Sequence, residues 1–206
     1  MAGRADQYQG TGYNPGPPIT PSVNQVATGI GSLSDTSAAT GSNGFDLTTV
    51  EGLNGLVANL QSVADFVGTY PTNWGTPSQP IVNFITGDLT TPTSTIGNGI
   101  LIVQGTLTLS GNFKWNGLVL VIGTGALVKN GGGNGYINGA LLVANVNNPA
   151  GGVVRAGSNP VVHDPGTPLF DWNGGGTANI QYDSCALNDA LTTSYYRVIS
   201  FRELTY

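Results

Sequence analysis

The side chains that could support catalysis are few. His163 is the only histidine in the sequence, and it stands next to Asp164 and Pro165. A catalytic triad needs a base that is linked both to a nucleophile and to an orienting group, whereas neighbours in an extended segment usually point apart. The sequence also lacks a Gly-x-Ser-x-Gly nucleophile motif. We therefore expect His163 to be a loop or surface residue, and we predict no catalytic residue.

Acidic side chains are the other candidates for chemistry. Cleavage of a polysaccharide would need two or more carboxylates on one face. The candidates Asp164, Asp171, Asp183 and Asp189 all follow the repeated region described below, and Trp172 stands beside one of them. Since Asp is also favoured in turns, solvated or turn-capping roles are the simpler interpretation. Asp164, Asp171, Trp172 and Asp183 are retained as a candidate ligand or partner surface.

No cofactor and no metal site is predicted. Cys185 is the only cysteine, which excludes an internal disulfide and a multi-cysteine metal site, and we expect a buried thiol or an intermolecular bridge. The glycine-rich run over residues 131–135 is similar to calcium-binding nonapeptide repeats, but it lacks the Asp that they need. It is not a phosphate-binding loop either, because no Gly-Lys-Ser/Thr follows.

The composition is that of a turn-rich chain with little charge. Of the 206 residues, 8% are charged, 32 are Gly and 12 are Pro, while 39% are hydrophobic, enough to form the core of one domain. The formal net charge of −5, without any basic run, makes nucleic acid a poor partner. No uninterrupted apolar stretch of about 18 residues is present, so we expect no membrane insertion by this chain as given.

Two segments precede the repeated region. Residues 1–44 are rich in Gly, Pro, Ser and Asn and are predicted to form an irregular arm, which leaves residues 45–206 as a single domain. Apolar residues at three- and four-residue steps predict a helix over residues 47–67, with Thr48 and Glu51 in the pattern of a capping box. We expect this helix to cap the first coil of the repeated region.

Three apolar runs, each introduced by Asn-Gly, form an internal repeat. They begin at Asn98, Asn116 and Asn138, with offsets of 18 and 22 residues. Shorter alternating runs at residues 106–109 and 126–128 lie between them, each followed by a turn. Each repeat therefore contains about two strands and two corners.

A repeat of this length is typical of one coil of a β-solenoid, in which equivalent strands stack in parallel. Asn and Gly suit the left-handed backbone of the corners, and Asn side chains can bond to their counterparts one coil away. We predict a mainly β fold: a parallel β-solenoid of about three to five coils over residues 81–183, with one capping helix and the irregular arm. Further coils are expected at residues 81–85 and 178–182, and residues 195–206 are a candidate final strand. An antiparallel sandwich or barrel is the alternative.

Aromatic residues within and after the repeats could line a glycan or partner surface. The larger contribution of such side chains to protein cores favours a role as plugs at the corners of the solenoid. They are Phe113, Trp115, Tyr136, Trp172 and Tyr182.

Several of these stretches together resemble the periplasmic or surface domain of bacterial PilX-like proteins, which are associated with type IV pili. The stretches are residues 99–112, 115–123, 134–140, 180–187 and 196–203. The resemblance covers the chain from about residue 80 to its end. It implies a minor pilus component, which in this family carries an N-terminal apolar helix. Such a helix is missing here, and we expect either an excised ectodomain or a relative that uses its Gly-Pro arm differently.

These observations predict a non-enzymatic extracellular or cell-surface protein of bacteria, facing the periplasm during assembly. Its role would be structural or adhesive, as a pilus-associated subunit or a self-assembling filament subunit. The expected partners are copies of itself or pilus subunits, with a glycan as a further option. The alternative is a carbohydrate-binding or carbohydrate-active β-helix protein.

Overall fold

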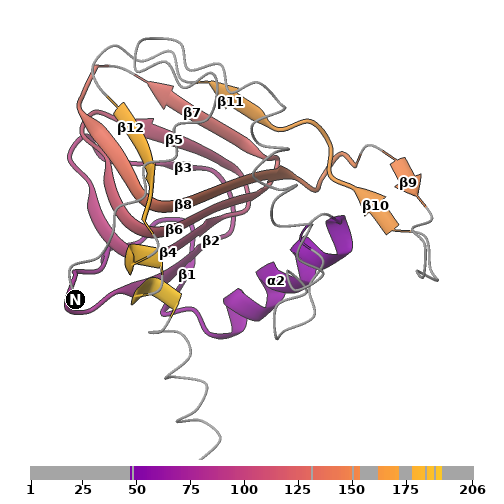
Figure 1. Cartoon of the computed structure of the whole chain (residues 1–206), viewed down its shortest axis with the longest axis horizontal. Helices are drawn as coiled ribbons and strands as arrows, with labels where there is room; N and C mark the ends of the chain where they lie inside the picture. Colours follow the sequence, from indigo (N-terminus) through magenta and orange to yellow (C-terminus); the bar gives the residue numbers. More distant parts are fainter. Residues whose placement is uncertain are drawn as a thin grey trace, which may run out of the picture.

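The computed structural model describes residues 47, 49–130, 132–149, 151–153, 162–171, 178–183, 185–187 and 189–191. The predicted arm over residues 1–44 and the candidate strand over residues 195–206 lie outside these ranges. Within them the chain is mainly β, and parallel strands wind into a solenoid of about four turns (Figure 1).

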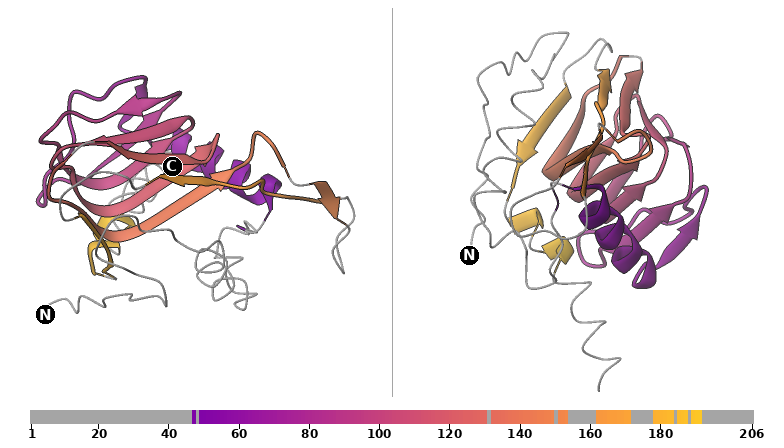
Figure 2. Two further views of the ribbon diagram at one scale, coloured as in Figure 1. Left: turned by 90° about the horizontal axis from the view of Figure 1, so that it is seen from above. Right: turned by 90° about the vertical axis from the view of Figure 1, so that its right-hand side faces the viewer.

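Two parallel sheets form the walls of the solenoid. In spatial order, the first contains β1 (Phe66–Gly68), β2 (Ile81–Ile85), β4 (Ile96–Val103), β6 (Lys114–Gly123), β8 (Gly135–Asn145) and β12 (Ala178–Tyr182). The second contains β11 (Leu169–Asp171), β7 (Ala126–Asn130), β5 (Thr106–Ser110) and β3 (Leu89–Thr90). A short antiparallel pair, β9 (Gly151–Val153) and β10 (Val162–Asp164), extends away from the stacked strands (Figure 2). The solenoid is thus confirmed, and an antiparallel sandwich or barrel is excluded for the repeated region.

The three Asn-Gly repeats lie directly over one another, as the sequence predicts. Asn98 is in register with Asn116, and Asn116 with Asn138. The two further coils are present as well, because β2 pairs with β4 and β12 pairs with β8, both in parallel.

The asparagines of these repeats form a ladder of side-chain hydrogen bonds. The Nδ2 of Asn116 donates to Oδ1 of Asn98 at 3.1 Å, and the Nδ2 of Asn138 donates to Oδ1 of Asn116 at 3.4 Å. The ladder ends on a carboxylate, since Asn138 Nδ2 also donates to Oδ2 of Asp183 at 3.0 Å. The polar side chains of successive coils therefore satisfy one another.

The glycine after each asparagine is required by the backbone. Gly99, Gly117 and Gly139 have φ values of +119°, +126° and +136°, a region that L side chains rarely adopt. A Cβ on Gly117 would overlap the carbonyl oxygen of Gly99, and a Cβ on Gly139 would overlap that of Gly117. The coils can approach this closely only because these positions carry no side chain.

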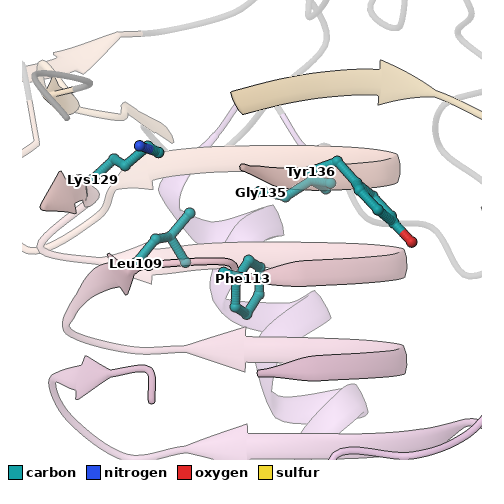
Figure 3. A pocket seen from close by; sticks show the side chains of 7 residues that line it. Leu109, Phe113, Lys129, Gly135 and Tyr136 are labelled. Atoms are coloured by element: carbon teal, nitrogen blue, oxygen red, sulfur yellow. The ribbon is translucent and has the colours of Figure 1, made fainter. Parts of the chain in front are cut away.

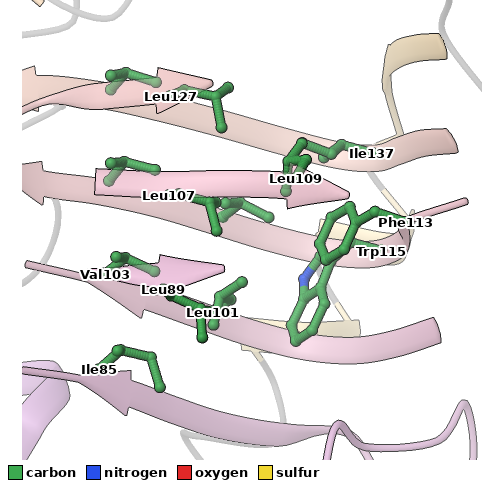
Figure 4. Packing of buried hydrophobic residues seen from close by; sticks show 13 residues of the cluster. Ile85, Leu89, Leu101, Val103, Leu107, Leu109, Phe113, Trp115, Leu127 and Ile137 are labelled. Atoms are coloured by element: carbon green, nitrogen blue, oxygen red, sulfur yellow. The ribbon is translucent and has the colours of Figure 1, made fainter. Parts of the chain in front are cut away.

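Both faces of the larger sheet are buried, which explains why its strands are continuously apolar. In β4, Leu101 and Val103 point into the solenoid, whereas Ile100 and Ile102 point outward into a second apolar layer. Figure 4 shows the interior layer, in which apolar side chains of neighbouring coils stack on one another and Trp115 fills one end. The ring of Phe113 stacks on that of Trp115 with 6.1 Å between their centroids, so these two aromatics plug the interior as expected.

Helix α2 (Val50–Ser62) covers the outer face of the larger sheet. Its residues Leu53, Val57 and Leu60 join the outward-pointing side chains of β2, β4 and β6 in the second apolar layer. The expectation of a helix to residue 67 is wrong, because Phe66–Gly68 forms β1, the edge strand of the larger sheet. Strand β1 therefore covers the first coil in place of the predicted helix, and the helix packs against the side of the solenoid.

The start of this helix also differs from the expected capping box. Its N-cap is Thr49, whose side chain accepts a hydrogen bond from the Gly52 N–H at 3.0 Å. Thr48 lies outside the described residues. The Glu51 carboxylate is engaged elsewhere, with β10.

Substitution of Gly117 by Ala tests the close approach of the coils. We expect Gly117→Ala to lower the free energy of unfolding by at least about 3 kcal/mol, because it adds backbone strain and a clash with the neighbouring carbonyl oxygen. The matched control is Gly87→Ala, since a Cβ at Gly87 meets nothing within 4 Å. Urea unfolding should place the control within about 0.5 kcal/mol of the parent. Equal stabilities of the two variants would contradict the described stacking.

Removal of the central rung tests the asparagine ladder. Asn116→Ala leaves Asn98 and Asn138 each short of one hydrogen bond, so we expect a loss of about 2 kcal/mol in the free energy of unfolding. The exposed Asn147, whose side chain is outside the ladder, gives the control variant Asn147→Ala. A loss in Asn116→Ala no larger than in this control would show that the ladder does not stabilise the stack.

Candidate functional site

The acidic residues selected from the sequence are distributed over different parts of the fold. Asp164 ends β10 in the antiparallel pair, Asp171 ends β11 in the smaller sheet, and Asp183 follows β12 in the larger sheet. Trp172 lies outside the described residues. None of the three carboxylates lines either of the two depressions described below. In the described part of the chain, the predicted surface of these four residues therefore does not coincide with either depression.

Asp183 has a structural role that uses both of its carboxylate oxygens. Oδ2 accepts the last bond of the asparagine ladder. Oδ1 accepts from the N–H groups of Cys185 and Ala186 at 2.9 and 3.1 Å, at the start of a short helical segment. These bonds are those of a helix N-cap. They place Cys185 at an exposed position, so the expectation of a buried thiol is wrong.

His163 is paired with Glu51 of helix α2. Its Nδ1 lies 2.6 Å from Glu51 Oε1, and its backbone N–H donates to Oε2 at 3.0 Å. The two hydrogen bonds from His163, first that of the backbone and then that of the ring, lower the pKa of the Glu51 carboxyl from 4.5 to about 2. Both side chains are nearly half exposed. These two hydrogen bonds hold the projecting strand β10 against helix α2.

The lowered pKa of Glu51 gives a direct test of this contact. A carboxyl with a depressed pKa stabilises the fold above pH 4.5 and loses that contribution as the pH falls toward 2. In His163→Ala the ring bond is lost while the backbone bond remains, so we expect the Glu51 pKa to rise part of the way to 4.5. Carbon-detected NMR titration of the Glu51 carboxyl measures this value. The exposed Thr167 provides the control variant Thr167→Ala, and an unchanged pKa in His163→Ala would contradict the contact.

A small cavity lies between the coil of β5 and β6 and the coil of β7 and β8, near Lys129 and Tyr136 (Figure 3). Its volume is about 10 Å³, room for about one water and too little for an organic substrate. Lys129 is 3% exposed, and burial lowers the pKa of its ammonium group. Only its place in the alternating run marks this residue in the sequence, and Leu109 is its counterpart one coil earlier.

An open groove of about 360 Å³ lies on the outside of the solenoid. It is lined by Ser94, Ile96, Asn112, Lys114 and Asn134. These residues lie in or just after the turns that lead into β4, β6 and β8, so three successive coils contribute to one surface. Sequence reasoning missed this groove, although the polar positions two to four residues before each repeated Asn were visible in the sequence.

The geometry of the groove is fixed by inter-coil hydrogen bonds. The N–H of Asn134 donates to Oδ1 of Asn112 at 2.7 Å, and the N–H of Lys114 donates to the Thr95 carbonyl at 2.8 Å. The Lys114 Nζ lies 5.8 Å from the centroid of the Tyr136 ring, a cation–π contact between neighbouring coils. The groove is therefore held by the same stacking that builds the solenoid.

A metal site and a membrane-spanning helix each place requirements on the described residues. No three His, Cys, Asp or Glu side chains gather there closely enough to hold a metal ion. None of the helices in the described ranges combines the length and apolar character needed to cross a membrane.

The fold defines this chain as a parallel β-solenoid protein. Comparisons with protein-family models, with curated proteins and with solved structures find no match to it. Its function must therefore be inferred from its own geometry.

Proposed function

We propose that this chain is a non-enzymatic structural or adhesive protein of the bacterial cell surface, associated with pili or assembling with copies of itself. The proposal rests on the contacts that the polar side chains of this chain make between coils. Asn98, Asn116, Asn138 and Asp183 join one coil to the next, instead of converging on a cleft. Such a stack is a stiff scaffold whose outer surfaces and ends are available for contact.

The first end of the solenoid is protected against addition of a further strand. Its edge strands β1 and β3 have only three and two residues. Side chains satisfy the neighbouring amides: Asp65 accepts from the Val82 N–H at 2.8 Å, and Asp88 accepts from the Thr106 N–H at 2.6 Å. Short edges and local caps of this kind oppose pairing with another chain.

The last end offers a longer edge. β12 has five residues, and among the described strands none pairs with its far side. Tyr182 on this strand is 41% exposed. A strand from a second subunit could extend the larger sheet here through main-chain hydrogen bonds. The proposed assembly is therefore directional, with the last coil as the receiving end.

The resemblance to PilX-like proteins supports the pilus-associated form of this proposal and a location on the cell surface. The carbohydrate-active alternative would require Asp164, Asp171 and Asp183 to converge across a cleft. Asp164 and Asp171 belong to two different sheets, and Asp183 follows a strand of the third sheet and is engaged as a cap. Support for a hydrolytic site is accordingly weaker than support for a scaffold.

Light scattering of the purified chain over a wide concentration range tests the proposed self-association. We expect a mass that increases with concentration, and a smaller increase in Tyr182→Lys, because a lysine on an edge strand opposes pairing. Val67→Lys, at the protected first edge, is the matched control and should assemble as the parent does. A concentration-independent monomer, or equal effects of the two substitutions, would contradict assembly through the last coil.

A further inference from the structure

The outer face of the larger sheet is divided into an apolar part and a polar part. Ile100 and Ile102 belong to the apolar part, which helix α2 covers. Nearer the start of the strands, outward positions carry Ile96, Lys114 and Tyr136, which are in register on β4, β6 and β8. Their outward direction follows from strand alternation, because Trp115 points into the interior. The groove described above occupies this polar part.

Lys114 gives the groove a positive charge in an otherwise acidic protein. Only two lysines belong to the described residues, and the other, Lys129, is buried. Among those residues, the Lys114 ammonium contacts the Tyr136 ring, and no carboxylate pairs with it. A partly exposed cation between neutral amides is locally complementary to an anionic ligand.

The remaining groups of the groove suit a ligand rich in hydroxyl groups. Asn112 uses its Oδ1 for the Asn134 N–H, and its Nδ2 makes no hydrogen bond in the described structure. The Asn134 amide and the Ser94 hydroxyl belong to the same wall. Tyr136 does not line the groove, but its ring lies beside Lys114, is 36% exposed and offers an apolar surface for sugar C–H groups. Coils repeat every ~4.8 Å, so equivalent groups recur at a regular spacing across the groove.

We propose that this groove binds an anionic polysaccharide. A carboxylate of the sugar chain contacts the Lys114 Nζ, a hydroxyl group bonds to the Asn112 amide, and one sugar ring packs beside Tyr136. An acidic peptide fits less well, because β4, β6 and β8 are paired on both sides and present no free edge for a peptide backbone. The site does not depend on the proposed assembly, since it lies on the side of the solenoid and not at its ends.

Calorimetric titration of the full chain with hexagalacturonate tests the proposal, with neutral cellohexaose and a hexaglutamate peptide as comparison ligands. We expect hexagalacturonate to bind, and added salt to weaken it. Lys114→Gln should lower the affinity roughly fivefold, through loss of one partly exposed charge-assisted contact. Tyr136→Ala should lower it by a similar factor, because it removes both the ring surface and the contact that orients Lys114.

Tyr70→Ala is the matched control, because Tyr70 is a 50% exposed aromatic outside the groove, and it should bind as the parent does. Circular dichroism confirms that each variant retains the fold. The proposal is overturned if hexagalacturonate does not bind, if hexaglutamate binds equally well, or if Lys114→Gln leaves the affinity unchanged. Since binding and self-association are measured separately, failure of one proposal is distinguishable from failure of the other.

Discussion

The contact between the backbones of successive coils is the constraint on which the rest of the structure depends. At Gly117 the chain adopts a φ of +126° and the Gly99 carbonyl of the preceding coil occupies the place of a Cβ. This approach brings Asn98 and Asn116 into register, so their amides can bond. It also fixes which side chains of each strand face inward, and thereby places one apolar layer inside the solenoid and another beneath helix α2.

The repeated region could be predicted from the sequence because the same physical requirement recurs in every coil. An Asn-Gly pair and the apolar run after it are visible as a repeat, and equivalent residues of a repeat stack. The sequence predicts these pairs at the corners, whereas the structure places them within β4, β6 and β8. The non-repeated parts were predicted less well. Strands β1, β9 and β10 have three residues each, which is too short for a period to be detected. The end of helix α2 was placed too late, because Val67 continues the apolar spacing although it belongs to β1.

Contacts between distant segments were the least accessible to sequence reasoning. Glu51 and His163 are separated by 112 residues, and Glu51 fitted a local capping pattern that the structure does not use. Asp183 ends the asparagine ladder although Gln181 is the residue in register with Asn138, so the repeat does not reveal this contact. The groove around Lys114 likewise depends on register, since its walls come from three coils. The residue types were visible, whereas their convergence requires the fold.

The central claim is that the three Asn-Gly repeats stack in parallel and in register. Cross-strand nuclear Overhauser effects on isotope-labelled protein test it most directly. Contacts between an amide proton of one repeat and an α proton of the next, following Ile100, Leu118 and Ala140 in order, are the predicted result. Close pairs of α protons between the repeats, as antiparallel strands produce, or the absence of contacts between equivalent residues, would contradict the account.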